Sequence, residues 1–473
     1  MAISEELRLM FAGAADFQER GFSSCGTALS LFFVDGLTSG SELADFVLRP
    51  LCEQLFPGTS EELYRQAASG VVRCAVCTPA ATAQAAAELL VNGYCALYIE
   101  GCERLLCFEV KGGDKRGPSA PESENTVKGA KDAFTETVRT NTALVRRHLR
   151  TPKLRLWQTT VGTRSLTNVT LLYIEGLTDP ALVARMQQRL KSICIDGLVS
   201  PSAVEEYVTG SRRTAFPLLE YTERTDKLCQ GLLAGRVGLL VDGLPLAYLA
   251  PVTLPKLMES QEDRAVDYVS ASCLRVIRYA ALLISLLLPA LYAAMAMFHQ
   301  EMLPTKLLLA IIESKKDVPF PTILEVLGIL AAFELLQEAG LHLPQAIGTA
   351  VSIIGGLVVG TAAVDAKLVS PAALIVAASS GICGFTLPSR DLSDAIRVWR
   401  FALTIFAGIA GLYGVTVGFL LLVIHLGSLS SFGIAYLAPF SGARTGHALL
   451  RERLCKQKYR DAELHPLDER NQA

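Results

Sequence analysis

Residues 279–300 read YAALLISLLLPALYAAMAMFHQ, an uninterrupted run of 22 uncharged residues. A helix needs ~20 apolar residues to cross the ~30 Å hydrocarbon core of a bilayer, so this run is long enough to span it. Three further uncharged runs follow, between Glu338 and Asp365, between Lys367 and Arg390, and between Arg400 and Arg444. An ordinary soluble domain does not bury four such helices in so short a stretch. The pattern therefore predicts a multi-pass membrane domain over residues 270–430.

The remainder of the chain has the composition of a water-soluble protein. Of the 473 residues, 19% are charged, and these gather before residue 278 and after residue 443. The net charge of −2 gives no basic field of the kind that attracts nucleic acid. The first residues, MAISEELRLM, carry acids where a secretory signal peptide needs basic residues and an apolar run. We therefore expect the soluble part to stay in the cytoplasm and to bind no nucleic acid.

One apolar segment is unusual because it carries three carboxylates. Residues 321–340 read PTILEVLGILAAFELLQEAG and contain Glu325, Glu334 and Glu338. Ionisable groups are costly in hydrocarbon and usually face a bundle interior or a water-filled path, so these glutamates are candidate ion-pathway residues. The alternative is an amphipathic helix at the membrane surface, with its carboxylates in water. The preceding run KLLLAII, residues 306–312, is too short to cross and is expected to be re-entrant, interfacial or part of a loop.

The basic residues predict the orientation of the membrane domain. Arg275 and Arg278 flank the first run, and the tail from Arg444 onward holds seven Lys and Arg residues. By the positive-inside rule both ends are expected in the cytoplasm, which requires an even number of crossings. The number stays open between four and six helical segments, because residues 321–340 can count as a span and the last run is long enough to cross twice.

Two pairs of glycines, each spaced four residues apart, offer small helix faces. They are Gly356 with Gly360 and Gly414 with Gly418. Glycines at this spacing let two helix backbones approach closely, within one chain or between subunits. We predict close helix packing at these positions, and the sequence leaves open which helices they join.

The soluble part contains an internal duplication. ALSLFFVDGLTSGSELADFVLRPL (28–51) matches NVTLLYIEGLTDPALVARMQQRL (168–190), and ELLVNGYCALYIEGCERLLCFEV (88–110) matches GLLAGRVGLLVDGLPLAYLAPV (231–252). In each segment an apolar β-rich run ends in an acid and a glycine, which can adopt the turn that ends a strand. The repeat turn positions are Asp35, Gly36, Glu100, Gly101, Glu175, Gly176, Asp242 and Gly243.

The duplication predicts the fold class and the domain order. We expect a cytoplasmic α/β region of two related subdomains, residues 1–115 and 131–260, followed by an all-α multi-pass membrane bundle. A segment rich in Gly, Pro and Ser, residues 116–130, joins the subdomains as a polar linker or loop. Residues 431–473 are expected to form a basic cytoplasmic tail. Whether the two lobes capture a small molecule between them stays open, because no ligand-fixing constellation is visible.

No constellation of residues points to catalysis or to a cofactor. The twelve cysteines are scattered, as expected of buried thiols in a reducing compartment. Cys74 and Cys77 form a C-x-x-C, yet no second pair follows at zinc spacing. The sequence also contains no match to the motif of a nucleotide-binding loop or of a nucleophile elbow. We therefore predict no catalytic residues, no metal and no cofactor, in a protein that is not an enzyme.

Six stretches of the chain carry long, ordered motifs. They are residues 132–177 (beginning DAFTETVRTNTALVRRHLR), 189–208 (RLKSICIDGLVSPSAVEEYV), 216–254, 283–311, 318–344 and 431–440 (SFGIAYLAPF). Together they resemble the A-subunit family of GerA-type spore germination receptors along nearly the whole chain. The sequence departs from that family before residue 132, where the usual Gly-Pro-Arg is missing, and at Ala435, where the family has proline.

The resemblance implies a location and a set of partners. It implies cytoplasmic N-terminal subdomains, a helical bundle in the inner membrane of the spore and both chain ends in the cytoplasm. It also implies two other subunits as partners, a B-type transporter-like subunit and a C-type lipoprotein. Finally, it implies a homo-oligomeric ring of A subunits around an ion pathway in the lipid bilayer.

Three hypotheses on function remain. The leading one is a subunit of a spore germination receptor that relays nutrient sensing and forms an oligomeric ion-release pathway, in which membrane carboxylates favour cations. The alternative is a non-conducting membrane scaffold or regulatory subunit. The third is a secondary transporter, which would require discontinuous helices in two inverted halves that the sequence does not display.

Overall fold

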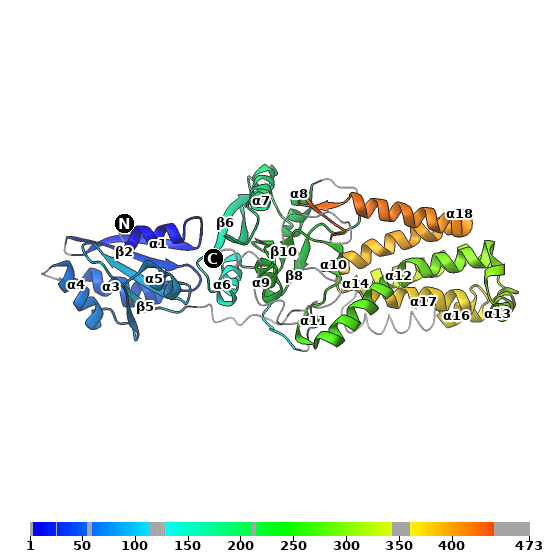
Figure 1. The fold of residues 1–473 in the computed structure, drawn as a ribbon, viewed down its shortest axis with the longest axis horizontal. Coiled ribbons are helices and arrows are strands. Elements are labelled where there is room, and N and C mark those ends of the chain that lie inside the picture. The colour runs from blue at the N-terminus through cyan, green and yellow to red at the C-terminus, as the bar shows by residue number, and fades with distance from the viewer. Residues whose placement is uncertain are drawn as a thin grey trace.

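The molecule consists of two α/β subdomains and a helical bundle, arranged in a row along its longest axis (Figure 1). The computed structural model describes residues 3–24, 26–53, 59–112, 121, 124, 126, 128–210, 214–342 and 360–438. We call residues 3–112 subdomain 1, residues 133–265 subdomain 2 and residues 268–428 the bundle.

Subdomain 1 is built on one antiparallel five-stranded sheet. Its strands are β1 (Phe17–Ser24), β2 (Thr27–Val34), β3 (Cys77–Ala80), β4 (Tyr94–Ile99) and β5 (Leu105–Glu109), in the order β1-β2-β4-β5-β3. Helices α1 (Ile3–Met10) and α5 (Ala83–Leu90) pack on one face. The chain over the other face forms α2 (Gly40–Glu42), η1 (Leu43–Leu48), α3 (Arg49–Glu53), α4 (Ser60–Gln66) and η2 (Ala67–Val71). Each face has its own hydrophobic core, because alternate side chains of a strand point to opposite sides.

Subdomain 2 repeats this architecture. Its strands are β6 (Leu154–Val161), β7 (Thr167–Ile174), β8 (Glu220–Thr222), β9 (Val237–Val241) and β10 (Ala247–Ala250), in the order β6-β7-β9-β10-β8. Helices α6 (Val138–His148) and α9 (Thr225–Leu233) cover one face, and α7 (Pro180–Ser192), η3 (Pro201–Ala203) and α8 (Val204–Thr209) cover the other. Strand for strand the order equals that of subdomain 1. The predicted fold class, two related α/β subdomains followed by a helical region, is confirmed.

The acid–glycine pairs of the repeat follow directly after strands. The backbone φ angle is +83° at Gly36 after β2 and +82° at Gly176 after β7. It is +91° at Gly101 after β4 and +82° at Gly243 after β9. Only glycine enters this left-handed region without strain, so these positions fix where each strand stops and the chain reverses.

A buried ion pair joins the two subdomains. Nε of Arg146, on α6, lies 2.7 Å from Oδ2 of Asp16, and its Nη2 lies 2.9 Å from Oδ1. The two side chains are 0% and 6% exposed. Beside them, Nη1 of Arg155 donates to the carbonyl oxygen of Met10 at 2.9 Å. These contacts therefore hold the two subdomains together, because a buried charge is stable only when it is paired and hydrogen-bonded.

The C-terminal region is a bundle of helices that extends away from subdomain 2 (Figure 1). Helices α10 (Leu254–Leu257) and α11 (Glu262–Ala265), at the end of subdomain 2, lead into it. Its elements are α12 (Tyr268–Phe298), η4 (Gln300–Met302), α13 (Thr305–Lys315), α14 (Thr322–His342), α16 (Gly360–Asp365), α17 (Pro371–Phe385) and α18 (Arg390–Ser428). Among the described residues, α12 and α18 are long and apolar enough to cross a membrane, and α17 is a shorter apolar helix. Most of the predicted span between Glu338 and Asp365 lies outside the described residues.

Helix α18 is a hairpin of two antiparallel halves. Helical geometry breaks at Ala410 (φ −133°, ψ 16°) and Gly411 (φ 61°, ψ −142°). Each half of about 20 residues is ~30 Å long at a rise of ~1.5 Å per residue. Gly418 of the second half faces Leu403 of the first so closely that an added Cβ would come within 2.7 Å of it. The sequence leaves open how often the last uncharged run crosses the membrane. In the structure this run is shared between the two helical halves of α18.

After α18 the chain returns to subdomain 2. Strands β11 (Ser430–Ser431) and β12 (Ile434–Ala435) form a small hairpin, and Oγ of Ser431 donates to the carbonyl oxygen of Leu218 at 2.8 Å. Tyr436 is fully buried. Residues 431–438, the start of the predicted basic cytoplasmic tail, pack against subdomain 2, because this apolar stretch gains by leaving water. The basic residues from Arg444 onward lie outside the described residues.

One hydrophobic core crosses the boundary between subdomain 2 and the bundle. It contains Phe216 and Leu218 before β8, Leu286 of α12, Leu403 of α18 and Tyr436 after β12. Because the same buried cluster belongs to both parts, subdomain 2 cannot move away from the helices without exposing apolar surface.

The pair between Asp16 and Arg146 gives the first prediction. Asp16→Ala leaves the buried guanidinium of Arg146 without its counter-charge, and we expect a loss of about 3–5 kcal/mol in the free energy of unfolding of the α/β region. Urea unfolding followed by circular dichroism measures this. Glu19→Ala is the control, because it removes an exposed pair with Arg8 and should cost less than about 1 kcal/mol. Equal losses in the two variants would show that burial adds nothing to the Asp16 pair.

Candidate functional site

The joint between subdomain 2 and the bundle contains a chain of buried ion pairs. Asp263 of α11 binds two arginines near the start of α12. Its Oδ2 lies 3.1 Å from Nε of Arg275 and 2.7 Å from Nη1 of Arg278, and its Oδ1 lies 2.8 Å from Nη2 of Arg278. The three side chains are 1%, 7% and 14% exposed. We call Asp263, Arg275 and Arg278 the clasp.

Glu259 links the clasp to α10. Its Oε1 lies 2.9 Å from Nη1 of Arg275, and its Oε2 lies 2.7 Å from Nζ of Lys256. Burial alone would raise the pKa of Glu259, but Lys256 and Arg275 lower this pKa to about 2. The carboxylate therefore stays ionised and holds α10 to the first residues of α12.

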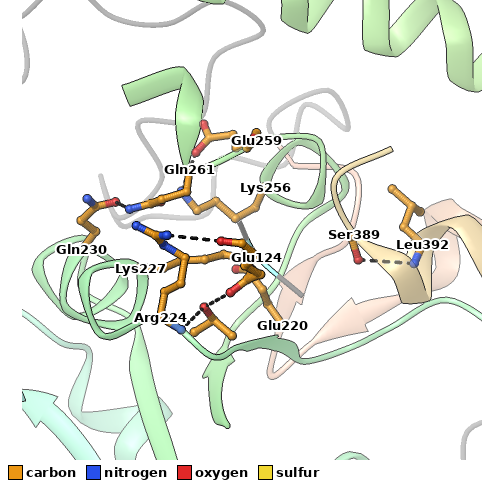
Figure 2. Close-up of polar contacts among 12 residues, drawn as sticks. Glu124, Glu220, Arg224, Lys227, Gln230, Lys256, Glu259, Gln261, Ser389 and Leu392 are labelled. Carbon is orange, nitrogen blue, oxygen red and sulfur yellow. Dashed lines mark hydrogen bonds and ion pairs between the residues drawn. The ribbon is translucent and has the colours of Figure 1, made fainter. Parts of the chain in front are cut away.

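Glu220 of β8 lies at the centre of a neighbouring ion-pair cluster in subdomain 2, which Figure 2 shows in part. Its Oε2 accepts from Nη1 of Arg236 at 2.6 Å, and its Oε1 lies 3.1 Å from Nζ of Lys227. Lys227 in turn donates to Oε1 of Glu124 at 2.8 Å. Burial alone would raise the pKa of Glu220, but Lys227 and Arg236 lower it to about 2. Burial lowers the pKa of Lys227, but the two carboxylates outweigh it and raise that pKa.

Arg224 fastens the segment that joins the two subdomains. Its side chain is 1% exposed, and its Nη1 donates to Oγ1 of Thr126 at 2.8 Å. Its Nη2 donates to the carbonyl oxygen of Ala130 at 2.9 Å, and its Nε donates to Oδ1 of Asp226 at 3.0 Å. The described part of the predicted linker is thus bound to subdomain 2 by a buried guanidinium group.

A second attachment lies at the other end of the bundle sequence. The backbone N–H of Val252 donates to Oγ of Ser431 at 3.1 Å, and the N–H of Leu254 donates to the carbonyl oxygen of Tyr436 at 2.9 Å. Gly433 has φ +88° and packs on Arg185 of α7 with no room for a Cβ. Subdomain 2 therefore holds both the start of α12 and the end of α18.

The structure places Glu334, a predicted ion-pathway residue, among cations. Its Oε1 lies 2.5 Å from Nη2 of Arg400, and its Oε2 lies 2.8 Å from Nη1 of Arg397. Arg400 is 2% exposed and also donates to Oγ of Ser380 at 3.3 Å. That hydroxyl donates to the carbonyl oxygen of Ser285 at 2.7 Å. One polar network thus joins α14, α18, α17 and α12.

Glu325, the second predicted residue, is paired elsewhere. Its side chain is 0% exposed, and its Oε1 lies 3.2 Å from Nζ of Lys315. About 13 Å of helix separates Glu325 from Glu334 along α14. Glu338 follows Glu334 by one turn and shares its helix face. The three carboxylates therefore do not converge on a single site within this chain.

Two of the predicted glycine faces are used within the chain. A Cβ on Gly414 would collide with the carbonyl oxygen of Phe406, and Gly418 packs on Leu403, so both glycines press the halves of α18 together. Gly360 lies against α17, where an added Cβ would come within 3.6 Å of Leu374. Its predicted companion Gly356 lies outside the described residues.

The acids at the repeat turns bind basic side chains or backbone N–H groups. Asp35 binds Arg139, Glu175 accepts from Nε of Arg155 at 2.9 Å, and Asp242 accepts from the N–H of Val138 at 3.0 Å. The N–H of Glu100 donates to the carbonyl oxygen of Ala28 at 3.1 Å. Asp35 of subdomain 1 and Asp242 of subdomain 2 therefore both contact the start of α6.

The described part of the chain offers no constellation typical of metal binding. No group of three or more His, Cys, Asp or Glu residues that could hold a metal ion occurs among the described residues. Burial raises the pKa of Cys74 to about 11 and also raises the pKa of Cys77. A thiol that stays protonated is a poor nucleophile and a poor metal ligand.

The sequence alone did not reveal the clasp. Arg275 and Arg278 were assigned to membrane orientation only, and their acidic partners lie in an ordinary charged stretch, ESQEDRAVD. A usable signal exists, because the two arginines are three residues apart and therefore share a helix face. If such a basic pair is buried, it requires acidic side chains nearby. Asp263, 12 residues before Arg275, is such an acid.

Comparison with known proteins identifies relatives of the whole chain. Residues 5–463 match the profile of the family described as Bacillus/Clostridium GerA spore germination protein. Over 438 residues the chain is 35% identical to the uncharacterized membrane protein YfkQ of Bacillus subtilis (strain 168), which covers 92% of this chain and 85% of that protein. Over 376 residues it is 36% identical to spore germination protein A1 of the same organism, covering 79% of this chain and 78% of that protein.

Among solved structures, the chain is similar to the crystal structure of the N-terminal domain of the A subunit of the Bacillus megaterium spore germinant receptor GerK3. The sequences are 27% identical, and the match covers 52% of this chain and 92% of that chain, with a TM-score of 0.41.

The low pKa values of Glu220 and Glu259 predict how stability depends on pH. Each lies at about 2 in the folded chain, against an ordinary value of 4.5. An acid whose pKa is lowered by folding contributes stability above its unfolded pKa and loses this contribution as the pH falls. We therefore expect Glu220→Gln to melt below the wild type at pH 7, and the gap to narrow between pH ~4.5 and ~2.

Differential scanning fluorimetry of the detergent-solubilised chain measures this gap. Glu53→Gln is the control, because it alters an exposed pair with Arg49 and should leave the melting temperature unchanged at every pH. A gap for Glu220→Gln that stays constant down to pH 2 would show that the residue acts through packing rather than through its charge.

Proposed function

The chain belongs to the Bacillus/Clostridium GerA family of spore germination proteins, and we propose that it is the A-type subunit of a germinant receptor complex in the spore inner membrane. In this role the two α/β subdomains pass a conformational change to the bundle when a nutrient is sensed. The germination role is supported by the family, and the relay is supported by the contacts at the joint. The proposal includes no catalytic step.

The single observation that carries the relay is the clasp. Asp263 contacts both arginines at 2.7–3.1 Å, and all three groups are largely withdrawn from water. Separating them would leave buried charges unpaired, at a cost of about 3–5 kcal/mol. A rotation of subdomain 2 is therefore cheaper if α12 moves with it than if the clasp breaks. Coupling between distant sites requires a structural element that both sites act on, and the clasp is that element in the proposed relay.

We also propose that α12 and both halves of α18 cross the bilayer. Their lengths support this, and so do apolar side chains that face outward from the bundle, such as Ile409 and Tyr413 at 73% and 74% exposure. The start of α12 and the end of α18 both contact subdomain 2, which favours an even number of crossings in total, so these three segments would not be all of them. The soluble part and both ends of the bundle would then lie on the cytoplasmic side.

The ion-release pathway and the partners are finer parts of the proposal. Paired ionisable groups at membrane depth are typical of ion paths, and the network around Glu334 is of this kind. The family resemblance adds a ring of copies, a B-type subunit and a C-type lipoprotein.

A specific observation favours the second candidate function, a non-conducting scaffold. Glu325 and Glu334 are neutralised by basic side chains of the same chain, so neither is free to attract ions in this conformation.

The clasp predicts a germination defect. In spores that carry Asp263→Ala in place of the wild type, we expect the response to nutrient to slow on the order of tenfold, because the coupling free energy is lost. The fall in optical density of a spore suspension exposed to amino acids, sugars and bile salts measures the response, and immunoblotting checks the protein level. Glu53→Ala, at an exposed ion pair, is the matched control. Wild-type germination of Asp263→Ala spores would exclude the relay through α12.

The ion pathway predicts a flux that depends on Glu334. Protein assembled in liposomes should pass monovalent cations, and Glu334→Gln should reduce this flux severalfold, because Arg400 then presents uncompensated positive charge. Glu301→Gln, at an exposed position beyond α12, should leave the flux unchanged. If an assembled wild-type ring passes no ions, the scaffold replaces the channel as the preferred function.

A further inference from the structure

A carboxylate at the end of the bundle farthest from the subdomains already holds a cation, which is the side chain of Lys315 (Figure 1 shows α13 at this end). Glu325 lies in the first turn of α14, and its Oε1 is 3.2 Å from Nζ of Lys315. The same ammonium group donates to Oγ1 of Thr322. Two oxygen atoms of the chain therefore surround one tethered positive charge.

The surroundings favour a positive charge at this point. The N–H of Ser370, which caps α17, donates to Oε2 of Glu325 at 3.0 Å and fixes the carboxylate. Oε1 makes no hydrogen bond of ordinary geometry within the described part of the chain, and the buried hydroxyl of Tyr292 lies beside Ser370. Apolar residues such as Val326 and Leu330 pack around this end of α14. Coulomb attraction is stronger in such apolar surroundings than in water.

Access to the carboxylate leads through the lysine. The side chain of Lys315 is 20% exposed, whereas that of Glu325 is 0% exposed. Of the two side chains, only that of Lys315 is in contact with solvent. A lysine carries its charge on a flexible four-carbon stem, so it can withdraw without any movement of the backbone.

We propose that Glu325, Thr322 and Tyr292 form a binding site for an alkali-metal cation, and that Lys315 is the tethered ion that fills it in this conformation. Oxygen ligands suit hard cations. An ammonium group has the same charge as a potassium ion and a similar size. When Lys315 withdraws, a mobile cation takes the place of its ammonium group, so the net charge of the site does not change. The inference deepens the proposed ion pathway and rests on it for any effect on flux, but binding itself requires no conduction.

Thermal melting of the full chain in detergent tests the site. In choline chloride, whose cation is too large to enter, Lys315→Met should melt below the wild type, because Glu325 is left buried and unpaired. Potassium chloride at the same ionic strength should raise the melting temperature of Lys315→Met by ~2 °C or more. Lys315→Arg, and Lys306→Met at an exposed lysine of the same helix, should melt equally in both salts.

The double variant Lys315→Met with Glu325→Gln separates cation binding from a general salt effect. It removes both charges, and its melting temperature should not depend on the salt. A potassium effect of equal size in the single and double variants would overturn the proposal, as would its absence in Lys315→Met. Should Lys315→Met fail to fold in choline chloride, the yield of folded protein in potassium chloride relative to choline chloride reports the same binding.

Potassium flux in liposomes separates the site from the pathway. Lys315→Met should conduct more than the wild type, and the double variant should lose this gain. A potassium-dependent rise in melting temperature without flux in any variant would leave the cation site standing and would contradict the proposed ion pathway instead.

Discussion

A charge that leaves water needs an opposite charge beside it, and this requirement organises the joints of the molecule. Asp16 with Arg146 joins the two subdomains, Asp263 with Arg278 joins subdomain 2 to α12, and the network of Glu334 joins four helices. In each case the partners come from different elements, so the charges are satisfied only when those elements meet. We infer that these pairs specify the arrangement of the parts, because apolar packing across the same joints would tolerate sliding.

Local signals in the sequence predicted the elements, whereas the joints depended on contacts that no local pattern contains. The duplication predicted both sheets, since alternating apolar runs and acid–glycine ends are read within one segment. The sequence leaves open whether the run that contains Gly411 crosses twice, because the turn at this glycine rests on packing against Phe298 at the end of α12. Glu334 is conspicuous in the sequence as a charge in an apolar run, but its partner Arg400 is 66 residues away. The clasp likewise depends on how α11 packs against α12.

Subdomain 2 is attached to the helices at two places that are far apart in sequence. The clasp holds the start of α12, and the β11–β12 hairpin holds the end of α18 through Ser431. Between these points a single hydrophobic core continues from the soluble part into the bundle. A rigid-body rotation of subdomain 2 would therefore tilt the first and last helices together, a form of motion typical of packed, bistable assemblies. Subdomain 1 takes part through α6, because Asp35 and Asp242 both contact the start of this helix.

The arginines of the clasp also bear on how the chain is made. Basic residues beside a span orient it during insertion, and nearby acids contribute little to that choice. While α12 enters the bilayer, as proposed here, Arg275 and Arg278 can therefore act as a topological signal whether or not Asp263 is close. Once α11 folds back, the same guanidinium groups become ligands of that carboxylate. Under that proposal, one short stretch would carry both a signal for membrane orientation and the contact that holds α12 to subdomain 2.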